Sequence, residues 1–139
     1  MLNTTNELIR DFTQLKEATF WLFMSTIAAI SLIIYMEARN QPDKTMTEVA
    51  SFAIEAARER NISVEKSLHV KGLYSWNWDG KNTKVDKKFI HDRIEPLVRK
   101  EISQKKRTLS GYKYFNKCSG KRFPGKRYKS NDICFYKGK

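Results

Sequence analysis

The longest apolar stretch of this chain runs from Ala18 to Met36 and contains no charged residue. As a helix it would be about 28 Å long, which just spans the hydrocarbon core of a bilayer. Serine, threonine and alanine make its middle only mildly hydrophobic, and no small-residue cleavage motif follows it. Residues 18–36 are therefore predicted to be a signal anchor, with a buried core helix as the alternative. Residues 1–17 form a polar N-terminal segment.

Periodic apolar positions predict two further helices. Thr45-Met46-Thr47-Glu48 has the form of a capping box, and a helix should follow it to about Arg60. Its predicted apolar face consists of Met46, Val49, Ala50, Ala53 and Ala57. Residues 61–72 are expected to be loop. A helix is then predicted from Val85 to about Gln104, and Pro96 must either kink it or begin a second helix.

Two short strands are predicted near the C-terminus, over residues 111–116 and 132–137. If they pair, Cys118 and Cys134 come within reach of each other. A disulfide between them would imply an oxidising compartment and would stabilise the fold by roughly 3 kcal/mol. Two free, partly buried thiols are the alternative. Two cysteines and two histidines are a poor set for zinc, so no metal is expected.

The charge of the chain is concentrated in its C-terminal third. The 139 residues suit one domain, and a hydrophobic content of 40% is enough for a core. From Arg99 to Lys139 there are 14 Lys and Arg residues against Glu101 and Asp132, which accounts for the whole net charge of +12. Such a surface suits an anionic partner: nucleic acid, anionic lipid or cell-wall polymer.

The first charged residue after the apolar stretch is Glu37. A carboxyl at such a boundary tends to keep its proton, because burial disfavours the charged form, and a general acid at neutral pH requires this. A helix-end glutamate beside Arg39 with no task is the alternative. Further along, Tyr74-Ser75-Trp76-Asn77-Trp78 alternates aromatic and small polar residues, which is typical of a carbohydrate-facing wall. A core strand that ends in the Asp79-Gly80 turn is the alternative there.

Four short motifs, in order, resemble the spore-cortex-lytic (SleB-type) family of cell-wall hydrolases. They are Tyr35-Met36-Glu37-Ala38-Arg39, Tyr74-Ser75-Trp76, Gly111-Tyr112-Lys113-Tyr114-Phe115 and Asp132-Ile133-Cys134-Phe135-Tyr136. The resemblance covers about residues 31–137. It implies a small, lysozyme-like α+β domain over residues 31–139, mainly helical with a short β-hairpin and preceded by the N-terminal hydrophobic helix. It also implies peptidoglycan as the substrate and Glu37 as the catalytic acid.

The expected reaction depends on how many carboxylates stand near the site. Hydrolases usually use a pair, but Glu48 and Glu55 are better explained by capping and a solvent face, and Asp79 by a turn. A lytic transglycosylase needs only Glu37, as acid and then as base toward the sugar's own 6-hydroxyl, and is therefore favoured over a hydrolytic muramidase of the same fold. The predicted substrate-binding residues are Ser75, Trp76, Trp78, Tyr112, Tyr114 and Asn116. No cofactor is expected.

Together, the apolar segment and the resemblance suggest a bacteriophage endolysin of the signal-anchor-release type. The enzyme would be held in the host inner membrane through residues 18–36, N-terminus in the cytoplasm, and then act in the periplasm as a monomer. No nucleic-acid partner is expected on this interpretation. Two rivals remain: a membrane-tethered, basic nucleic-acid-binding protein that uses the C-terminal third, and a small membrane protein that disturbs bilayers without chemistry.

Overall fold

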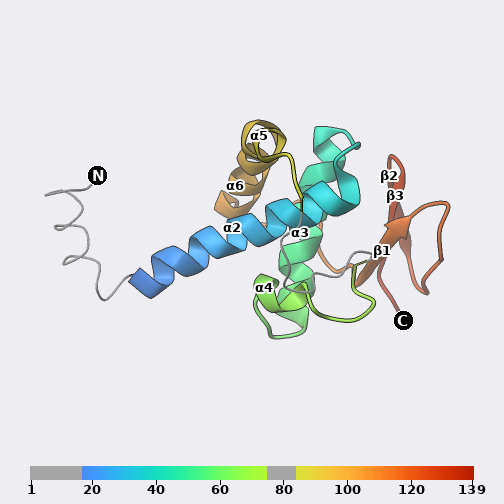
Figure 1. The fold of residues 1–139 in the computed structure, drawn as a ribbon. Coiled ribbons are helices and arrows are strands. Elements are labelled where there is room, and N and C mark those ends of the chain that lie inside the picture. The colour runs from blue at the N-terminus through green and yellow to red at the C-terminus, as the bar shows by residue number, and fades with distance from the viewer. Residues whose placement is uncertain (1–16, 75–83) are drawn as a thin grey trace, which may run out of the picture.

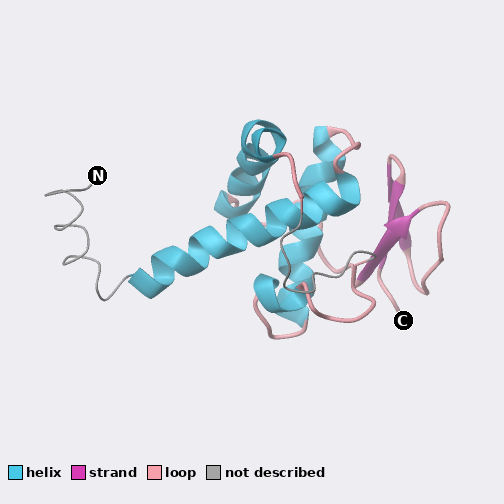
Figure 2. Ribbon diagram, viewed as in Figure 1, coloured by secondary structure: helices cyan, strands magenta, loops and turns pink. Residues whose placement is uncertain are grey.

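The computed structural model describes residues 17–74 and 84–139. Several helices form a body beside a small antiparallel sheet, which is drawn in Figure 1 by residue number and in Figure 2 by secondary structure. The predicted α+β class is confirmed. The predicted segment before residue 17, and the aromatic stretch after Tyr74, lie outside the described residues.

The helix that carries Glu37 is α2 (Glu17–Ala38). Its second half is core, because Ile27, Ile30, Ile33 and Ile34 are each at most 1% exposed. It packs against α3, α4 and α6, whereas its first turns extend past the other helices (Figure 1). In the described stretches 17–74 and 84–139, no helix combines the length and the apolar character that a membrane crossing needs.

Helix α3 (Asp43–Glu59) begins earlier than the predicted capping box allows. Pro42 is the residue before its first turn, so Thr45 lies inside the helix and caps nothing. The Glu48 carboxylate instead accepts hydrogen bonds from the hydroxyls of Tyr128, at 2.5 Å, and Ser130. The capping interpretation was therefore wrong, since a buried carboxylate takes the strongest donors within its reach.

The two faces of α3 also differ in part from the prediction. The predicted apolar face is confirmed, since all five of its residues are buried. Glu55, predicted to face solvent, is only 5% exposed, and its carboxylate lies 3.0 Å from Arg58 Nη2. The aliphatic stem of an arginine can cover such a carboxylate while its charged end stays in water.

The helical region between residues 85 and 104 is broken into three pieces. These are α5 (Lys87–Phe89), a π-helical turn η1 (Ile90–Ile94) and α6 (Glu95–Ser103). Pro96 stands in the first turn of α6, where its missing N–H costs nothing, so it begins a second helix as one of the two predictions stated. A short helix α4 (Val64–Ser67), capped by the Ser63 hydroxyl, lies in the stretch predicted as loop.

The sheet has three strands in the order β1-β3-β2: β1 (Tyr114–Lys117), β2 (Arg127–Ser130) and β3 (Ile133–Tyr136). The predicted pairing of the first and last strands is confirmed, with Asn116 opposite Cys134. The sequence did not predict β2, which lies between the two strands in the chain and forms a hairpin with β3. The sequence of β2, Arg-Tyr-Lys-Ser, does not look like a strand because it lacks aliphatic residues. Its inward side chains are Tyr128 and Ser130, which donate hydrogen bonds to Glu48 instead.

The sheet and the helices share one core around Phe52 of α3. Its ring lies 5.0 Å from that of Phe115, 5.8 Å from Phe135 and 6.5 Å from Tyr74, centroid to centroid. Helix α3 therefore covers one face of the sheet. Because α2 packs on α3, the last turn of α2 is brought to the end of β1.

Candidate active site

Glu37 is half-buried in the last turn of α2. The end of this helix is fixed by its neighbours: the Tyr35 hydroxyl accepts a hydrogen bond from the Asp86 N–H at 3.2 Å, and the Tyr35 ring meets the Phe89 ring edge-on at 6.1 Å. Arg39 folds back over the same tyrosine, 4.8 Å from the ring centroid, and donates to the Tyr35 carbonyl oxygen at 3.1 Å. The backbone that carries Glu37 is therefore held from both sides.

Two adjoining cavities open beside Glu37. The larger, of about 480 Å³, lies between the last turn of α2, the turn that follows it, the end of β1 and the β2–β3 turn. We call it the Glu37 cavity. The smaller, of about 310 Å³, is lined by Glu37 together with Phe115 and Asn116 of β1 and Ile133 of β3. Both volumes fall in the range of small-molecule sites, and Glu37 is common to both.

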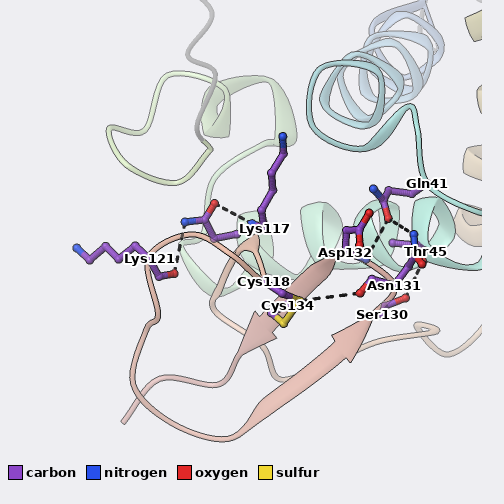
Figure 3. The surroundings of a disulfide bond; sticks show 10 residues. Gln41, Thr45, Lys117, Cys118, Lys121, Ser130, Asn131, Asp132 and Cys134 are labelled. Atoms are coloured by element: carbon purple, nitrogen blue, oxygen red, sulfur yellow. Dashed lines mark hydrogen bonds between the residues drawn. A yellow bond between two sulfur atoms is a disulfide. The ribbon is translucent and has the colours of Figure 1, made fainter.

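A buried glutamine closes one side of the Glu37 cavity (Figure 3). The Gln41 Oε1 atom accepts hydrogen bonds from Asn131 Nδ2 at 2.7 Å and from the Asp132 N–H at 3.3 Å. Asn131 has φ 53°, a left-handed conformation that asparagine tolerates in two-residue hairpin turns. The turn after α2 is thus bonded directly to the turn between β2 and β3.

The disulfide borders the same cavity. Cys118, which lines it, is bonded to Cys134 of β3, with the two Cα atoms 4.9 Å apart. The Cys118 N–H also donates to the Asp132 carbonyl oxygen at 2.8 Å. The predicted disulfide is confirmed, and it joins β1 to the central strand at the wall of the cavity.

A second carboxylate, which the sequence argument overlooked, lines the Glu37 cavity. Asp132 follows Asn131 in the β2–β3 turn, and Figure 3 shows its side chain on the same side of the sheet as that of Lys117. From the sequence, only Glu48, Glu55 and Asp79 stood out as possible partners of Glu37. The signal that could have revealed Asp132 is the Asn-Asp pair at the start of the predicted strand over residues 132–137, because such a pair favours a tight turn.

The predicted substrate-binding residues fall into three groups. Asn116 lines the smaller cavity together with Glu37. Tyr112 is buried against the rings of Tyr128 and Phe135, and Tyr114 stacks on Phe123 at 4.9 Å, so neither lines the two cavities beside Glu37. Three of the predicted residues lie outside the described residues: Ser75, Trp76 and Trp78.

Tyr74, the last described residue before the predicted aromatic wall, is only 3% exposed. Its hydroxyl has no hydrogen-bond partner among the residues that the structure describes, and the nearby Ser67 hydroxyl donates to the Val64 carbonyl oxygen at 2.5 Å. Burial raises the pKa of Tyr74 well above its ordinary value of 10.0. The nearby Ser67 hydroxyl and the positive charge of Arg60 oppose this rise, and the negative charge of Glu37 adds a smaller contribution to it.

The arrangement suits acid–base chemistry on a polar ligand. It offers Glu37 at the junction of two cavities, a second carboxylate across the larger one, and amide and cationic side chains around them. Over residues 17–74 and 84–139, no group of three or more His, Cys, Asp or Glu side chains could hold a metal ion. Comparisons of the chain with protein-family models, with curated proteins and with solved structures found no match.

Proposed function

We propose that this chain cleaves the glycan strands of peptidoglycan as a lytic transglycosylase of lysozyme-like architecture, with Glu37 as the general acid. The observation that carries the proposal is the position of Glu37: half-buried, in the last turn of a fixed helix, on the wall of two adjoining cavities faced by the sheet. The scissile bond joins two sugars. Each sugar needs a space of its own, and the proton donor must lie between the two spaces.

The proposed reaction begins when Glu37 gives its proton to the oxygen that joins two sugars. As a carboxylate, it then accepts the proton of the 6-hydroxyl of the muramyl sugar, whose oxygen bonds to C1 and closes a 1,6-anhydro ring. The Glu37 proton leaves with the departing sugar, and the 6-hydroxyl proton regenerates the acid. No water is consumed, so one carboxyl group serves both steps.

Hydrolysis is the second candidate, and one observation favours it. Asp132 lines the same cavity as Glu37, and a second carboxylate is the group that a hydrolase adds to its acid. In this reaction Asp132 would take a proton from a water molecule while that water attacks C1, and the product would carry a reducing muramic end.

The proposal includes the location of the enzyme. As in an endolysin, the enzyme would act on the wall from the periplasm. The Cys118–Cys134 disulfide supports the periplasmic part, since such bonds persist in oxidising compartments. The basic C-terminal third would keep the enzyme close to the anionic wall.

The test is mass spectrometry of purified peptidoglycan after incubation with the chain. The proposal expects fragments with 1,6-anhydro ends, and a rate that falls by about 10²-fold or more in Glu37→Gln, because a positioned acid contributes about this much. Reducing muramic ends would identify the hydrolase instead. The matched control is Glu59→Gln, the same change at an exposed glutamate in the last turn of α3, and it should keep the full rate.

Two results would overturn the proposal. Intact glycan after prolonged incubation with the oxidised chain would reject glycan cleavage altogether. Equal cleavage by the chain and by Glu37→Gln would reject Glu37 as the general acid. Tight binding of nucleic acid that weakens steeply with salt would then favour the rival of a basic nucleic-acid-binding protein.

A further inference from the structure

Gln41 is a buried polar side chain in the wall of the Glu37 cavity. It lies in the turn between α2 and α3 and is only 8% exposed, whereas glutamine is usually a surface residue. Its main chain is held on both sides. The Gln41 N–H donates to the Ala38 carbonyl oxygen at 3.0 Å, and the Gln41 carbonyl oxygen accepts from Arg93 Nη2 at 3.3 Å. The side chain therefore starts from a fixed point on the cavity wall.

The hydrogen bonds of the β2–β3 turn fix the orientation of the Gln41 amide. The Asp132 backbone N–H can only donate, so the Gln41 atom that it meets must be the oxygen. The same Oε1 atom also accepts the shorter bond from Asn131 Nδ2, as Figure 3 shows. Both bonds would be lost if the amide turned over, because Nε2 would then face two donors. The position of Nε2 is therefore fixed as well.

The Nε2 atom keeps its two N–H donors for a ligand. It donates no hydrogen bond to any residue within the described ranges 17–74 and 84–139. Within those ranges, the polar side-chain atoms that are sealed from solvent without a partner are the hydroxyl oxygens of Ser31 and Tyr74, so Nε2 is not sealed. Because Gln41 lines the Glu37 cavity, its donors are accessible from that cavity.

A donor that cannot turn over selects an acceptor. A sugar hydroxyl can donate or accept, so it adapts to either atom of an amide, whereas a carbonyl oxygen can only accept. The glycan strands of peptidoglycan carry such an oxygen in the acetamido groups of their sugars. A fixed N–H donor in the same cavity as Glu37 therefore suits the acetamido carbonyl.

We propose that the Glu37 cavity contains an acetamido subsite, in which Gln41 Nε2 donates a hydrogen bond to the carbonyl oxygen of the N-acetyl group of a bound sugar. This inference rests on the proposed function and names the substrate group that the cavity recognises. Gln41 binds and orients the sugar, while Glu37 remains the acid. The subsite distinguishes N-acetylated glycans from glycans that carry a hydroxyl at the same carbon.

Gln41→Glu tests the subsite with little change of shape. One carboxylate oxygen can still accept from Asn131 and Asp132, but the other would repel the acetamido carbonyl. Binding is measured by titration calorimetry in a Glu37→Gln background, which prevents turnover, with two neutral probes: the N-acetylglucosamine tetramer and cellotetraose. We expect the N-acetylated tetramer to bind about tenfold more tightly than cellotetraose, and Gln41→Glu to remove this preference. The affinity for cellotetraose should stay unchanged.

A spectroscopic measurement needs no substitution at Gln41. In a proton–nitrogen correlation spectrum of the same Glu37→Gln chain, the side-chain amide signals of Gln41 should shift with the N-acetylglucosamine tetramer and stay in place with cellotetraose. Gln104 is the matched control, since it is exposed and does not line the cavity. Its side-chain signals should respond to neither probe, and Gln104→Glu should leave both affinities unchanged.

The subsite is rejected if the folded Gln41→Glu chain keeps its affinity for the N-acetylated tetramer, or if the two probes bind alike before that change. An equal effect of Gln104→Glu would also reject it. If Gln41→Glu fails to fold, Gln41 side-chain signals that do not move with the N-acetylated tetramer reject the subsite on their own.

The same data separate this inference from the proposed function. Selection of N-acetylated sugars through Gln41 by a chain that leaves peptidoglycan intact would retain the subsite and reject the enzyme. Cleavage of peptidoglycan by a chain whose sugar binding is insensitive to Gln41→Glu would retain the enzyme and reject the subsite.

Discussion

The Tyr74 hydroxyl combines deep burial with missing hydrogen bonds. Within the described residues, buried side-chain hydroxyls without a partner are those of Ser31 and Tyr74. Such a group has lost its water without gaining a partner among the described residues, and a missing partner costs about 1–3 kcal/mol. The Tyr74 ring also packs on the rings of Phe52 and Phe115, so it contributes to the core independently of the hydroxyl.

Tyr74→Phe is expected to stabilise the fold by about 1 kcal/mol at pH 7, because it removes the unpaired hydroxyl and keeps the ring. The pH dependence follows from the raised pKa. The stability that requires a protonated Tyr74 is complete below its ordinary value of 10.0 and is lost as the pH rises from there toward the folded-state pKa. Urea unfolding at pH 7 and at pH 11 should show a larger alkaline loss in the parent chain than in Tyr74→Phe.

Ser31→Ala provides the control for this experiment. It removes the other buried, unpaired hydroxyl, but serine does not titrate in this range. It should therefore gain stability at pH 7 and keep the full alkaline loss of the parent chain. An alkaline loss that is the same in Tyr74→Phe and in the parent would contradict the assignment.

Among the elements, the loop between β1 and β2 is joined to the segment after β3 by a close backbone contact. The Gly138 N–H donates to the Pro124 carbonyl oxygen at 3.0 Å. Gly125 has φ +95°, and a Cβ atom there would lie 2.1 Å from the Gly138 carbonyl oxygen. Only glycine allows both the backbone conformation and the approach.

Gly125→Ala is therefore expected to lower the free energy of unfolding by about 3 kcal/mol, from a left-handed alanine and a backbone collision together. Gly72→Ala separates the two effects, because Gly72 has φ +81° and nothing within 4 Å of the added methyl. It should cost only about 1 kcal/mol. Equal losses in urea unfolding of the two variants would show that the collision is relieved at no cost.

The elements also show what sequence patterns could and could not reveal. The apolar face of α3 and the pairing of β1 with β3 were predictable, because both depend on side-chain periodicity that burial enforces. The strand β2 and the role of Glu48 were not predictable. The inward side chains of β2, Tyr128 and Ser130, bind the buried carboxylate of Glu48, which comes from α3. A pattern search treats Arg-Tyr-Lys-Ser as polar loop and cannot anticipate an acid from another element.

The residues of the candidate site also differ in whether the sequence could reveal them. Glu37 could be proposed from the end of an apolar run, and Asn116 from a strand-like motif. Asp132 and Lys117 come to line one cavity with Glu37 only through the packing of the sheet beside α2. Tyr112 was predicted to line the cleft from the motif that it shares with the resembled family, but its ring contributes to the core.

At the scale of the whole molecule, the Cys118–Cys134 disulfide joins two parts of the sheet beside the candidate site. Cys118–Cys134 closes a loop of sequence separation 16, and its reduction is expected to lower the free energy of unfolding by roughly 3 kcal/mol. Urea unfolding with and without dithiothreitol measures this difference. Under the proposed function, the same reduction should also lower the rate of glycan cleavage, because Cys118 forms part of the cavity wall.

The double variant Cys118→Ser and Cys134→Ser controls for other effects of the reductant. It should unfold at the midpoint of the reduced parent chain and should not respond to dithiothreitol. If oxidised and reduced parent chains share one midpoint, the bond contributes nothing to stability.

The strand order has a consequence for how the protein is made. β1 and β2 are not partners of each other; both pair with β3, which leaves the ribosome after them. During synthesis the helix with Glu37 emerges early, and domains fold as their parts become available. The opposite wall of its cavity can assemble only once β3, up to Tyr136, has left the ribosome, so the cavity beside Glu37 forms late in the folding of the chain.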